Sequence, residues 1–357
     1  MKVLHVLRRM DPGGIEVWLE RLLKAWPAND RPDFHFALES RDFGSLAERF
    51  RELGAQMHFV ASPRQPMQFQ RALGDVLNEF GPFQAMHVHT HYASSCALAV
   101  AAKARVPVRV AHSHADYRGY SAGWRRRAYA MAGRALLCQL STAKLAVSKG
   151  AARDLFGEEK GTCIVPCGME AKEFLSADRR PDPSRFNLIH VGRLVPEKNH
   201  EFLIRFMVEL RRSAPEARLL LVGDGPLRTS LEKFAESLGV AKAVHFLGAQ
   251  SDVPRWLSQA DVFVFPSLSE GLGMSAVEAQ AAGLPVLLAA HLPEEIDWLP
   301  GAVKRLALNV PKEDWVRAAL ALREYTPPPA ATRAEILKQS HFSMSSNVNI
   351  LRSIYAA

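Results

Sequence analysis

The chain has 357 residues, of which 48% are hydrophobic and 23% are charged, and its formal net charge is +8. This length predicts two domains, and the composition argues against a disordered protein. The positive charge lies in residues 1–175, which carry 24 Lys and Arg against 17 Asp and Glu, whereas residues 176–357 carry 21 against 20.

No segment for export or membrane insertion is expected. The first apolar run is too short for a signal peptide, and no later run approaches the roughly 18 apolar residues of a membrane-spanning helix. Four scattered cysteines indicate free thiols in a reducing compartment. We therefore expect a cytoplasmic protein. Its basic half suits peripheral contact with an anionic membrane or a lipid-linked acceptor, or serves solubility alone.

Strands alternate with helices along the first half. Short apolar runs predict strands at 2–7, 35–38, 57–60, 85–89, 108–112, 144–147 and 163–165. Amphipathic stretches predict helices at 16–26, 43–52, 69–80, 95–104 and 150–156. This order is typical of βαβ units in a mostly parallel sheet.

The alternation stops at a polar segment, Glu173–Ser184, which contains two prolines and is expected to link two domains. Strands then follow at 186–191, 218–222, 244–247, 262–265 and 286–289. Helices are expected at 201–212, 227–238, 253–258 and 274–282, and only helices after residue 289. Ligands of such sheets bind beyond the carboxyl ends of the strands, so the loops there are the candidate site.

Three of these loops in the second half carry cations or glycines. Arg193 and Lys198 lie five positions apart in the first loop, where both cations can converge on one diphosphate. In the second loop, Gly223 permits either a close approach of backbone to a ligand or a tight turn. In the third, a nucleobase can lie against the backbone near Leu247. Taken alone, each of these loops also fits an ordinary surface loop.

The fourth loop leads into a helix and contains Glu270 and, eight positions later, Glu278. Gly271 and Gly273 leave backbone N–H groups open where the helix begins, and such helix starts attract phosphate oxygens. Both carboxylates can then face one ligand, as a carboxylate binds ribose hydroxyls in dinucleotide sites. An ordinary helix cap with one surface glutamate is the alternative.

The segment Glu270–Glu278 resembles the E-x7-E signature of the family-four retaining glycosyltransferases. The similarity extends over nearly the whole chain, through Gly13–Glu16, Ala146–Ser148, Val165–Gly168, Gly192–Asn199, Val222–Pro226, Phe246–Gly248 and Glu278–Val286. Cys167 stands where Asn is commoner in the family. The segment His112-Ser113-His114 is similar to the corresponding segment of the subgroup that builds capsular and extracellular polysaccharides.

The resemblance implies an α/β protein of the GT-B fold, with two doubly wound Rossmann-like domains facing each other across a cleft. Residues 1–175 would form the acceptor-binding domain and 176–340 the nucleotide-sugar-binding domain. Residues 341–357 would form a C-terminal helix that packs back on the first domain. The implied function is transfer of a hexose-type sugar, with retention, from a nucleotide-diphosphate donor such as a UDP-sugar. The acceptor would be a saccharide or a lipid-linked saccharide.

The resemblance also implies roles for individual residues. Arg193 and Lys198 would neutralise the leaving diphosphate. Glu278 would hold the ribose, and Glu270 would bind hydroxyls of the transferred sugar. Further donor contacts are expected from Gly14, Gly223, Leu247, Gly271, Leu272, Gly273 and Met274.

No metal and no cofactor is expected. A D-x-D motif after a strand is missing, because Asp178 and Asp182 lie in the polar segment and Asp224 has no acidic partner. The two cations can stabilise the leaving charge instead. No carboxylate nucleophile of the kind that retaining glycosidases use is evident. We therefore expect same-face attack, in which the leaving phosphate takes the acceptor's proton.

Two histidine pairs follow strands of the first half. The resemblance implies that a histidine at the place of His112 or His114 contacts the donor sugar. Alternation along a strand puts His112 and His114 on one side and cannot choose between them, so both are catalytic candidates, with His114 slightly preferred. The strand end with His89 and His91 resembles the acceptor side of the family, which makes both candidates for acceptor contact. Core histidines are the alternative for each pair. A metal site is not expected, because no carboxylate or cysteine joins the pairs at ligand spacing.

Other functions remain open to test. The segment 124–134, with Arg127 and Arg134 on a predicted helix, suits an anionic membrane surface or plain solvent. Nucleic acid is not expected as a partner, because no recognition helix, zinc finger or aromatic–basic pattern is present. The enzymatic alternative is a nucleotide-sugar epimerase or a phosphorylase of the same fold. A non-catalytic scaffold is disfavoured by the intact charged residues.

Overall fold

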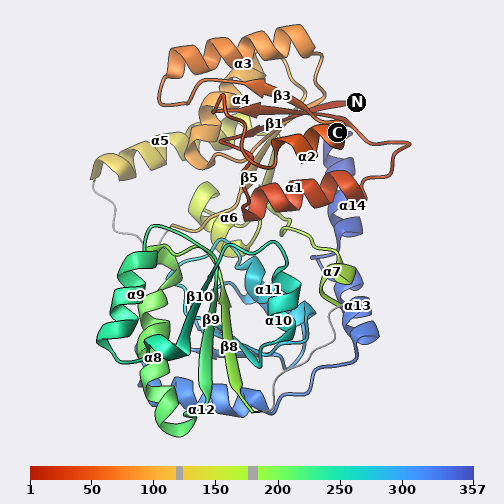
Figure 1. The fold of residues 1–357 in the computed structure, drawn as a ribbon. Helices are drawn as coiled ribbons and strands as arrows, with labels where there is room; N and C mark the ends of the chain where they lie inside the picture. The colour runs from red at the N-terminus through yellow and green to blue at the C-terminus, as the bar shows by residue number, and fades with distance from the viewer. Residues whose placement is uncertain (118–123, 176–183) are drawn as a thin grey trace. The chain divides into compact units, whose positions relative to one another are not determined.

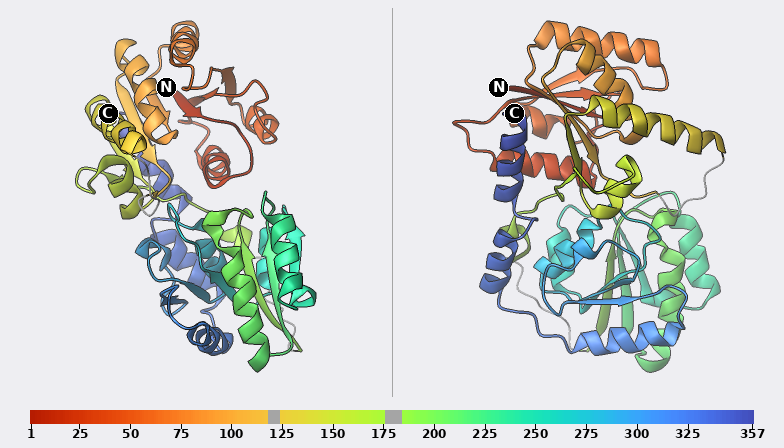
Figure 2. Two further views of the ribbon diagram at one scale, coloured as in Figure 1. Left: turned by 90° about the vertical axis from the view of Figure 1, so that its left-hand side faces the viewer. Right: turned by 180° about the vertical axis from the view of Figure 1, so that it is seen from behind.

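The computed structural model describes residues 1–117, 124–175 and 184–357. The chain divides into two compact units, one formed by residues 1–169 and 341–357 and the other by residues 170–340. Each unit holds one parallel β-sheet flanked by helices, as Figures 1 and 2 show. The two Rossmann-like domains expected from the sequence are therefore both present.

The sheet of the first unit has the strand order β3-β2-β1-β4-β5-β6-β7. Its strands are β1 (Lys2–Leu7), β2 (Asp33–Leu38), β3 (Gln56–Phe59), β4 (Ala85–Val88), β5 (Val108–Ser113), β6 (Ala143–Ala146) and β7 (Cys163–Ile164). Its helices are α1 (Gly14–Ala25), α2 (Ala47–Glu52), α3 (Pro66–Phe80), η1 (His91–Ala93), α4 (Ser94–Lys103), α5 (Trp124–Leu140), α6 (Lys149–Phe156) and α14 (Met344–Tyr355). The C-terminal helix α14 packs on α1.

The sheet of the second unit has the equivalent order β10-β9-β8-β11-β12-β13. Its strands are β8 (Phe186–Val191), β9 (Ala217–Val222), β10 (Val244–Gly248), β11 (Val262–Phe265), β12 (Val286–Ala289) and β13 (Val303–Leu306). Its helices are α7 (Ala171–Leu175), η2 (Pro196–Lys198), α8 (His200–Ser213), α9 (Arg228–Ser237), η3 (Ala241–Ala243), α10 (Val253–Ser258), α11 (Met274–Ala281), η4 (Glu294–Ile296), α12 (Lys312–Arg323) and α13 (Ala330–Gln339).

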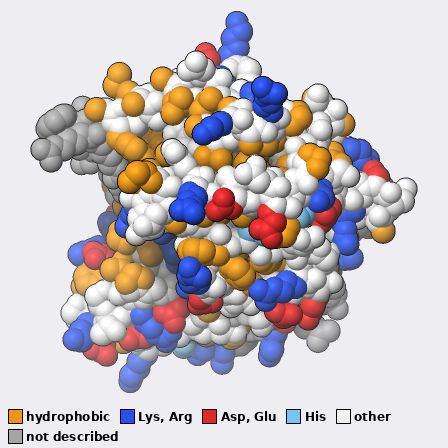
Figure 3. Space-filling view, turned by 90° about the horizontal axis from the view of Figure 1, so that it is seen from above, with side chains coloured by type: hydrophobic (Ala, Val, Ile, Leu, Met, Phe, Trp, Pro, Cys, Tyr) orange, Lys and Arg blue, Asp and Glu red, His pale blue; other side chains and the backbone are white. Residues whose placement is uncertain are grey.

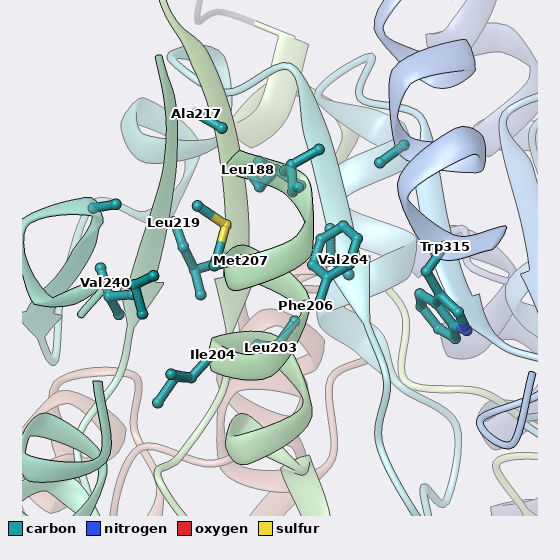
Figure 4. Close-up of a cluster of buried hydrophobic side chains, with 14 of the residues drawn as sticks. Leu188, Leu203, Ile204, Phe206, Met207, Ala217, Leu219, Val240, Val264 and Trp315 are labelled. Atoms are coloured by element: carbon teal, nitrogen blue, oxygen red, sulfur yellow. The ribbon is translucent and has the colours of Figure 1, made fainter. Parts of the chain in front are cut away.

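The core of the second unit shows why the apolar runs become central strands. Side chains of β8, β9 and β11 pack against α8, and Leu188, Phe206 and Val264 are completely buried (Figure 4). Trp315 of α12 is also fully buried and lies edge-on to Phe202. A parallel strand is covered on both faces, so its sequence is apolar throughout rather than alternating.

Two expectations about chain organisation were wrong. β13 pairs in parallel with β12, although only helices were expected there, because its sequence Val-Lys-Arg-Leu is short and charged, as edge strands often are. Residues 170–175, expected to end the first domain and to begin the linker, belong to the second unit, since α7 packs on α11 and α13 and Phe174 is buried. Asp178 and Asp182 lie outside the described residues.

Candidate functional site

In the second unit the strand order reverses between β8 and β11, so the loops after these strands start side by side. Two hydrogen bonds join the loops. The Leu268 N–H donates to the Glu197 carbonyl over 2.8 Å, and Asn199 Nδ2 donates to the Pro266 carbonyl over 3.1 Å. The loops that carry the predicted donor residues are therefore fixed to each other within this unit.

Lys198 and Glu270 meet where these loops join. Lys198 Nζ lies 2.6 Å from Glu270 Oε1, and the two side chains are 20% and 10% exposed. The lysine stem runs along Gly192, where a Cβ would come within 3.4 Å of it. Its ammonium lies 5.4 Å from the centre of the Phe265 ring. The structure thus brings together a cation and a carboxylate that the sequence assigned to one ligand.

The glycine turn after β9 packs tightly on the same loop. Gly223 has a φ of 136°, and a Cβ there would collide with the Gly192 carbonyl oxygen. Its N–H donates to the Gly248 carbonyl over 2.8 Å. Protein packing alone therefore requires glycine at this position, and a donor contact by Gly223 remains a prediction.

Helix α11 starts directly beyond β11 because of a second required glycine. Gly273 has a φ of 99°, and a Cβ there would lie 2.9 Å from a Phe265 ring carbon. The completely buried Gln280 anchors the helix through hydrogen bonds from both ends of its amide. The half-buried Glu278 lies in the second turn. The positive end of a rigid helix therefore lies at the carboxyl edge of the sheet.

The other donor candidates lie at this same edge of the sheet. Arg193 is exposed, and Leu272 is 4% exposed. Leu247, Gly271 and Met274 are half-buried. These residues follow or end β8, β10 and β11, whose carboxyl ends share one edge, so a single ligand along that edge can meet several of them.

Two histidines next to Lys198 carry no charge at neutral pH. His190 is fully buried and donates from Nδ1 to the Val264 carbonyl over 2.9 Å. Burial lowers its pKa well below the ordinary value, and His200 lowers it further. Burial also lowers the pKa of His200 to about 4, with Lys198 contributing. The lysine therefore supplies the positive charge at this spot.

In the first unit, α1 begins at Gly14 after the loop from β1. Among the described residues, no atom lies within 4 Å of a Cβ built on Gly14, so their packing does not require glycine there. In the first turn, burial and, to a smaller extent, the charge of Asp11 raise the pKa of Glu16 to about 7. The start of α1 therefore has room for an anion. Near neutral pH Glu16 is only partly ionised, so its carboxylate repels a bound phosphate only in part.

Five histidines on or directly after three neighbouring strands pack into one network: His5, His87, His89, His112 and His114. Four of their rings contact Trp18 of α1. His5 Nδ1 lies 3.0 Å from His89 Nε2, and His89 Nδ1 lies 2.9 Å from His114 Nε2. His87 Nε2 lies 3.1 Å from His112 Nδ1. Burial lowers the pKa of all five, to about 3 for His5 and His112. The network is therefore neutral at pH 7.

The two catalytic candidates, His112 and His114, differ in their exposure and in the hydrogen bonds of their rings. His112 is 1% exposed and uses both ring nitrogens, one with His87 and one donating to the Val165 carbonyl over 3.3 Å. His114 is half-buried. A direct substrate contact therefore fits His114 and does not fit His112. The predicted acceptor contact of His89 does not fit either, because this residue is 7% exposed and both of its nitrogens are engaged.

Two groups of three histidines, both including His89, place their ring nitrogens within 4.8 Å of one another. In space a cysteine does join them, because Cys167 Sγ lies 4.0 Å from His114 Nδ1. Most of these nitrogens, however, already bond to one another, to Tyr355 or to Val165. A cation would have to break those bonds, so we interpret the group as a hydrogen-bonded core. The absence of a metal stays a prediction.

His91 lies apart from this network and pairs with an acid that the sequence did not single out. His91 Nε2 donates to Asp154 Oδ2 over 2.9 Å. The backbone carbonyl of Asp154 accepts from the Tyr92 hydroxyl at 3.0 Å and from Arg134 Nη2 at 2.8 Å. Asp154 is 63 positions from His91 in a helix without a motif, so only the fold shows the pair.

The membrane candidate is only partly described. Arg134 of α5 is held by the Asp154 carbonyl, and Arg127 lies outside the described side chains. Exposed apolar side chains on the same helix include Tyr129, Met131 and Leu136. Among the described residues, no helix is both long enough and apolar enough to cross a bilayer.

Comparison with known proteins identifies the family. EpsF of Bacillus subtilis (strain 168), which is named as a glycosyltransferase, is 32% identical over 99% of this chain and 96% of its own length. An Escherichia coli UDP-Gal:α-D-GlcNAc-diphosphoundecaprenol α-1,3-galactosyltransferase is 29% identical over 38% of each chain. HepE of Anabaena, solved with UDP-glucose, shares the fold, with a TM-score of 0.79 and 18% identity over 100% of this chain and 99% of its own.

Two family models together match most of the chain. Residues 12–173 match the model for Glycosyltransferase Family 4, and residues 171–295 match the model for Glycosyl transferases group 1. With a relative of over 30% identity along its full length and the same pair of parallel-sheet domains, the chain belongs to glycosyltransferase family 4 and has the GT-B fold.

Proposed function

We propose that this glycosyltransferase moves a hexose, with retention of anomeric configuration, from a nucleotide-diphosphate donor to a saccharide or lipid-linked saccharide in cell-surface polysaccharide biosynthesis. The observation that carries the proposal is the Lys198–Glu270 pair between joined loops at the carboxyl edge of β8 and β11. A UDP-sugar is the first donor to test. UDP-glucose is bound in the HepE structure, and the E. coli relative is named for UDP-Gal.

The charges of the second unit support catalysis without a metal. Breaking the sugar–diphosphate bond leaves negative charge on the departing oxygen, and fixed cations aimed at it act most strongly in the transition state. Lys198 is held in place by Glu270, and Arg193 is exposed on the same loop. Bound diphosphate would share Lys198 with Glu270, whose second oxygen would bind sugar hydroxyls. Glu278 would hold the ribose.

We further propose that the acceptor attacks the same face of the sugar from which the diphosphate leaves. The C–O bond to the diphosphate breaks, the bond to the acceptor oxygen forms, and the acceptor's proton passes to the departing phosphate. His114 would contact the donor sugar, because it alone of the two candidates combines partial exposure with a fixed ring. An epimerase or phosphorylase is the alternative, and incubation with the donor alone or with phosphate distinguishes them.

A thermal-shift screen with nucleotide sugars tests the donor site. A bound donor raises the melting temperature of the native protein, and we expect a UDP-sugar to do so. Lys198→Ala and Glu278→Ala should each abolish measurable transfer, a loss of at least about 100-fold, and should remain folded. The matched controls are Lys242→Ala and Glu236→Ala, at exposed positions of the same unit. Turnover at the wild-type rate by either site variant would show that the donor site is misassigned.

Peripheral membrane contact is proposed for the first unit. Its face around α3 carries apolar and basic side chains close together (Figure 3). On α5, Tyr129 and Met131 are 59% and 70% exposed, and such residues can insert at the lipid surface. We expect sedimentation with vesicles containing phosphatidylglycerol but not with pure phosphatidylcholine vesicles, because the electrostatic attraction needs anionic lipid. Equal binding to both, or to neither, would contradict this proposal.

A further inference from the structure

We propose that His91, held by Asp154, binds and orients the attacking hydroxyl group of the acceptor in the first unit. In this assignment His91 Nδ1 accepts a hydrogen bond from the acceptor's hydroxyl as the acceptor docks, and the O–H turns to the departing phosphate, which takes the proton, as the new C–O bond forms. Asp154 is a positioning residue that never touches the acceptor. The inference rests on the proposed transfer reaction and adds to it the residue that orients the nucleophile. It separates His91 from the histidine network, which has no open nitrogen at His89 or His112.

The first observation is the orientation of the ring. Asp154 Oδ2 accepts from His91 Nε2 at 2.9 Å, and the side chains are 21% and 7% exposed. In the neutral imidazole this bond places the ring proton on Nε2, and Nδ1, which no described residue hydrogen-bonds, can accept a hydrogen bond. A histidine oriented by a buried carboxylate is the arrangement by which proteins fix a working imidazole.

The second observation is that the acid itself is fixed. The backbone carbonyl of Asp154 accepts hydrogen bonds from the Tyr92 hydroxyl and from Arg134 Nη2, which come from different elements. Its helix α6 starts at Ser148, whose side chain accepts from the Ala151 N–H at 3.1 Å. The His91 ring therefore rests on a support that is held independently of any ligand.

The third observation is the backbone of His91. Its φ is 54°, a left-handed conformation that glycine adopts far more easily than histidine. Among the described residues, positive φ outside glycine occurs only at His91, Arg105 and Asn199. His91 follows β4 and Asn199 lies in the donor loop after β8, so two of these strained residues lie at strand-order reversals, where ligands bind. A histidine in this conformation at a strand-order reversal indicates that its ring contacts a ligand.

The surroundings fit a saccharide. The Tyr117 ring, 45% exposed, lies edge-on to His91 with ring centres 5.3 Å apart. An exposed aromatic face beside a hydrogen-bond acceptor can cover the apolar side of a sugar ring while the imidazole binds one hydroxyl. The substrate class is therefore a sugar whose free hydroxyl is the nucleophile, and water can occupy the same position when the acceptor is absent.

The test compares His91→Gly and Asp154→Asn with the wild type. Glycine relaxes the strained backbone but leaves the buried Asp154 carboxylate without its donor, so the melting temperature of His91→Gly is compared with those of Asp154→Asn and the wild type. The chain also supplies a matched control in Asp33→Asn, because Asp33 Oδ2 lies 3.2 Å from His35 Nε2 at the opposite, amino end of a strand. The readouts are UDP release from UDP-galactose and UDP-glucose, the donor Kd and the melting temperature. Release is measured with water alone and with a synthetic N-acetylglucosaminyl diphospholipid.

We expect His91→Gly to lower UDP release about 100-fold, because the nucleophile loses its orientation, and Asp154→Asn to lower it about 10-fold. Donor Kd should stay within about twofold in both variants and all rates should be unchanged in Asp33→Asn. Release at the wild-type rate by His91→Gly would overturn this inference alone, as would an equal loss in Asp33→Asn. A wild-type protein that neither binds nor cleaves these donors contradicts the proposed function itself.

Discussion

At the scale of single residues, His5 shows how burial ties the first unit's stability to pH. It is fully buried, its Nε2 has no partner among the described residues, and burial lowers its pKa to about 3. An unfolded chain would take up a proton on this ring near pH 6.5, whereas the folded chain would not. Stability contributed by the neutral ring is therefore lost as the pH falls from 6.5 toward 3.

The variant His5→Phe tests this linkage. Phenylalanine keeps the packing against Phe34 and Phe36 and cannot take up a proton. Relative to the wild type, the free energy of unfolding should gain about 2 kcal/mol on going from pH 7 to pH 5, measured by urea unfolding at both values. His341→Phe, at an exposed position, should show no such gain. If His5→Phe loses stability with acid as steeply as the wild type, the ring is already charged in the folded state.

At the scale of elements, the glycine at the start of α1 can be compared with the glycine after β9, because the first is expected to serve function and the second serves packing. Gly223 is required by its neighbours, but Gly14 faces open space and is already the first residue of a helix. Alanine is the better helix former by up to about 1 kcal/mol. Gly14→Ala should therefore leave the melting temperature unchanged or raise it. The added methyl group would instead occupy space that a donor phosphate needs.

We expect Gly14→Ala to lower transfer at least about tenfold without loss of stability, measured by UDP release and thermal denaturation. Gly74→Ala on α3 is the control, because a Cβ there also meets no described atom within 4 Å and no donor-binding or catalytic residue is predicted on α3. Unchanged transfer in Gly14→Ala would mean that no phosphate approaches this helix start.

The sequence predicts elements well where burial dictates one residue type. Val262–Phe265 is apolar throughout and forms β11 with the expected bounds, because a central parallel strand is covered on both faces. The charged edge strand β13 has no such pattern and was missed. The family resemblance implied that Lys198 and Glu270 bind the same donor, and the fold brings the two side chains together. No periodicity links His91 to Asp154, because that pairing depends on where α6 packs.

At the scale of the whole molecule, the chain crosses from the second unit back to the first at its end, and Asn347 secures the returning helix. Asn347 is fully buried. Its Oδ1 accepts from Trp18 Nε1 at 2.7 Å and from the Gly168 N–H at 3.0 Å, and its Nδ2 donates to the His341 carbonyl at 3.1 Å. One side chain therefore links the first helix, the end of residues 1–169 and the C-terminal segment.

Replacing Asn347 should weaken one unit and spare the other. In Asn347→Leu, Trp18 Nε1 and the Gly168 N–H are left buried without an acceptor, and each such loss costs about 1–3 kcal/mol. Hydrogen exchange measured by mass spectrometry should therefore accelerate in β1, β4 and β5 and stay unchanged in β8, β9 and β11, while donor-induced protection in the second unit persists. Asn349→Leu, on the exposed side of the same helix α14, should change neither region. Uniform acceleration over both units would show that they unfold as one cooperative body, whereas acceleration confined to the first would establish that the donor-binding unit keeps its fold when the returning helix loosens.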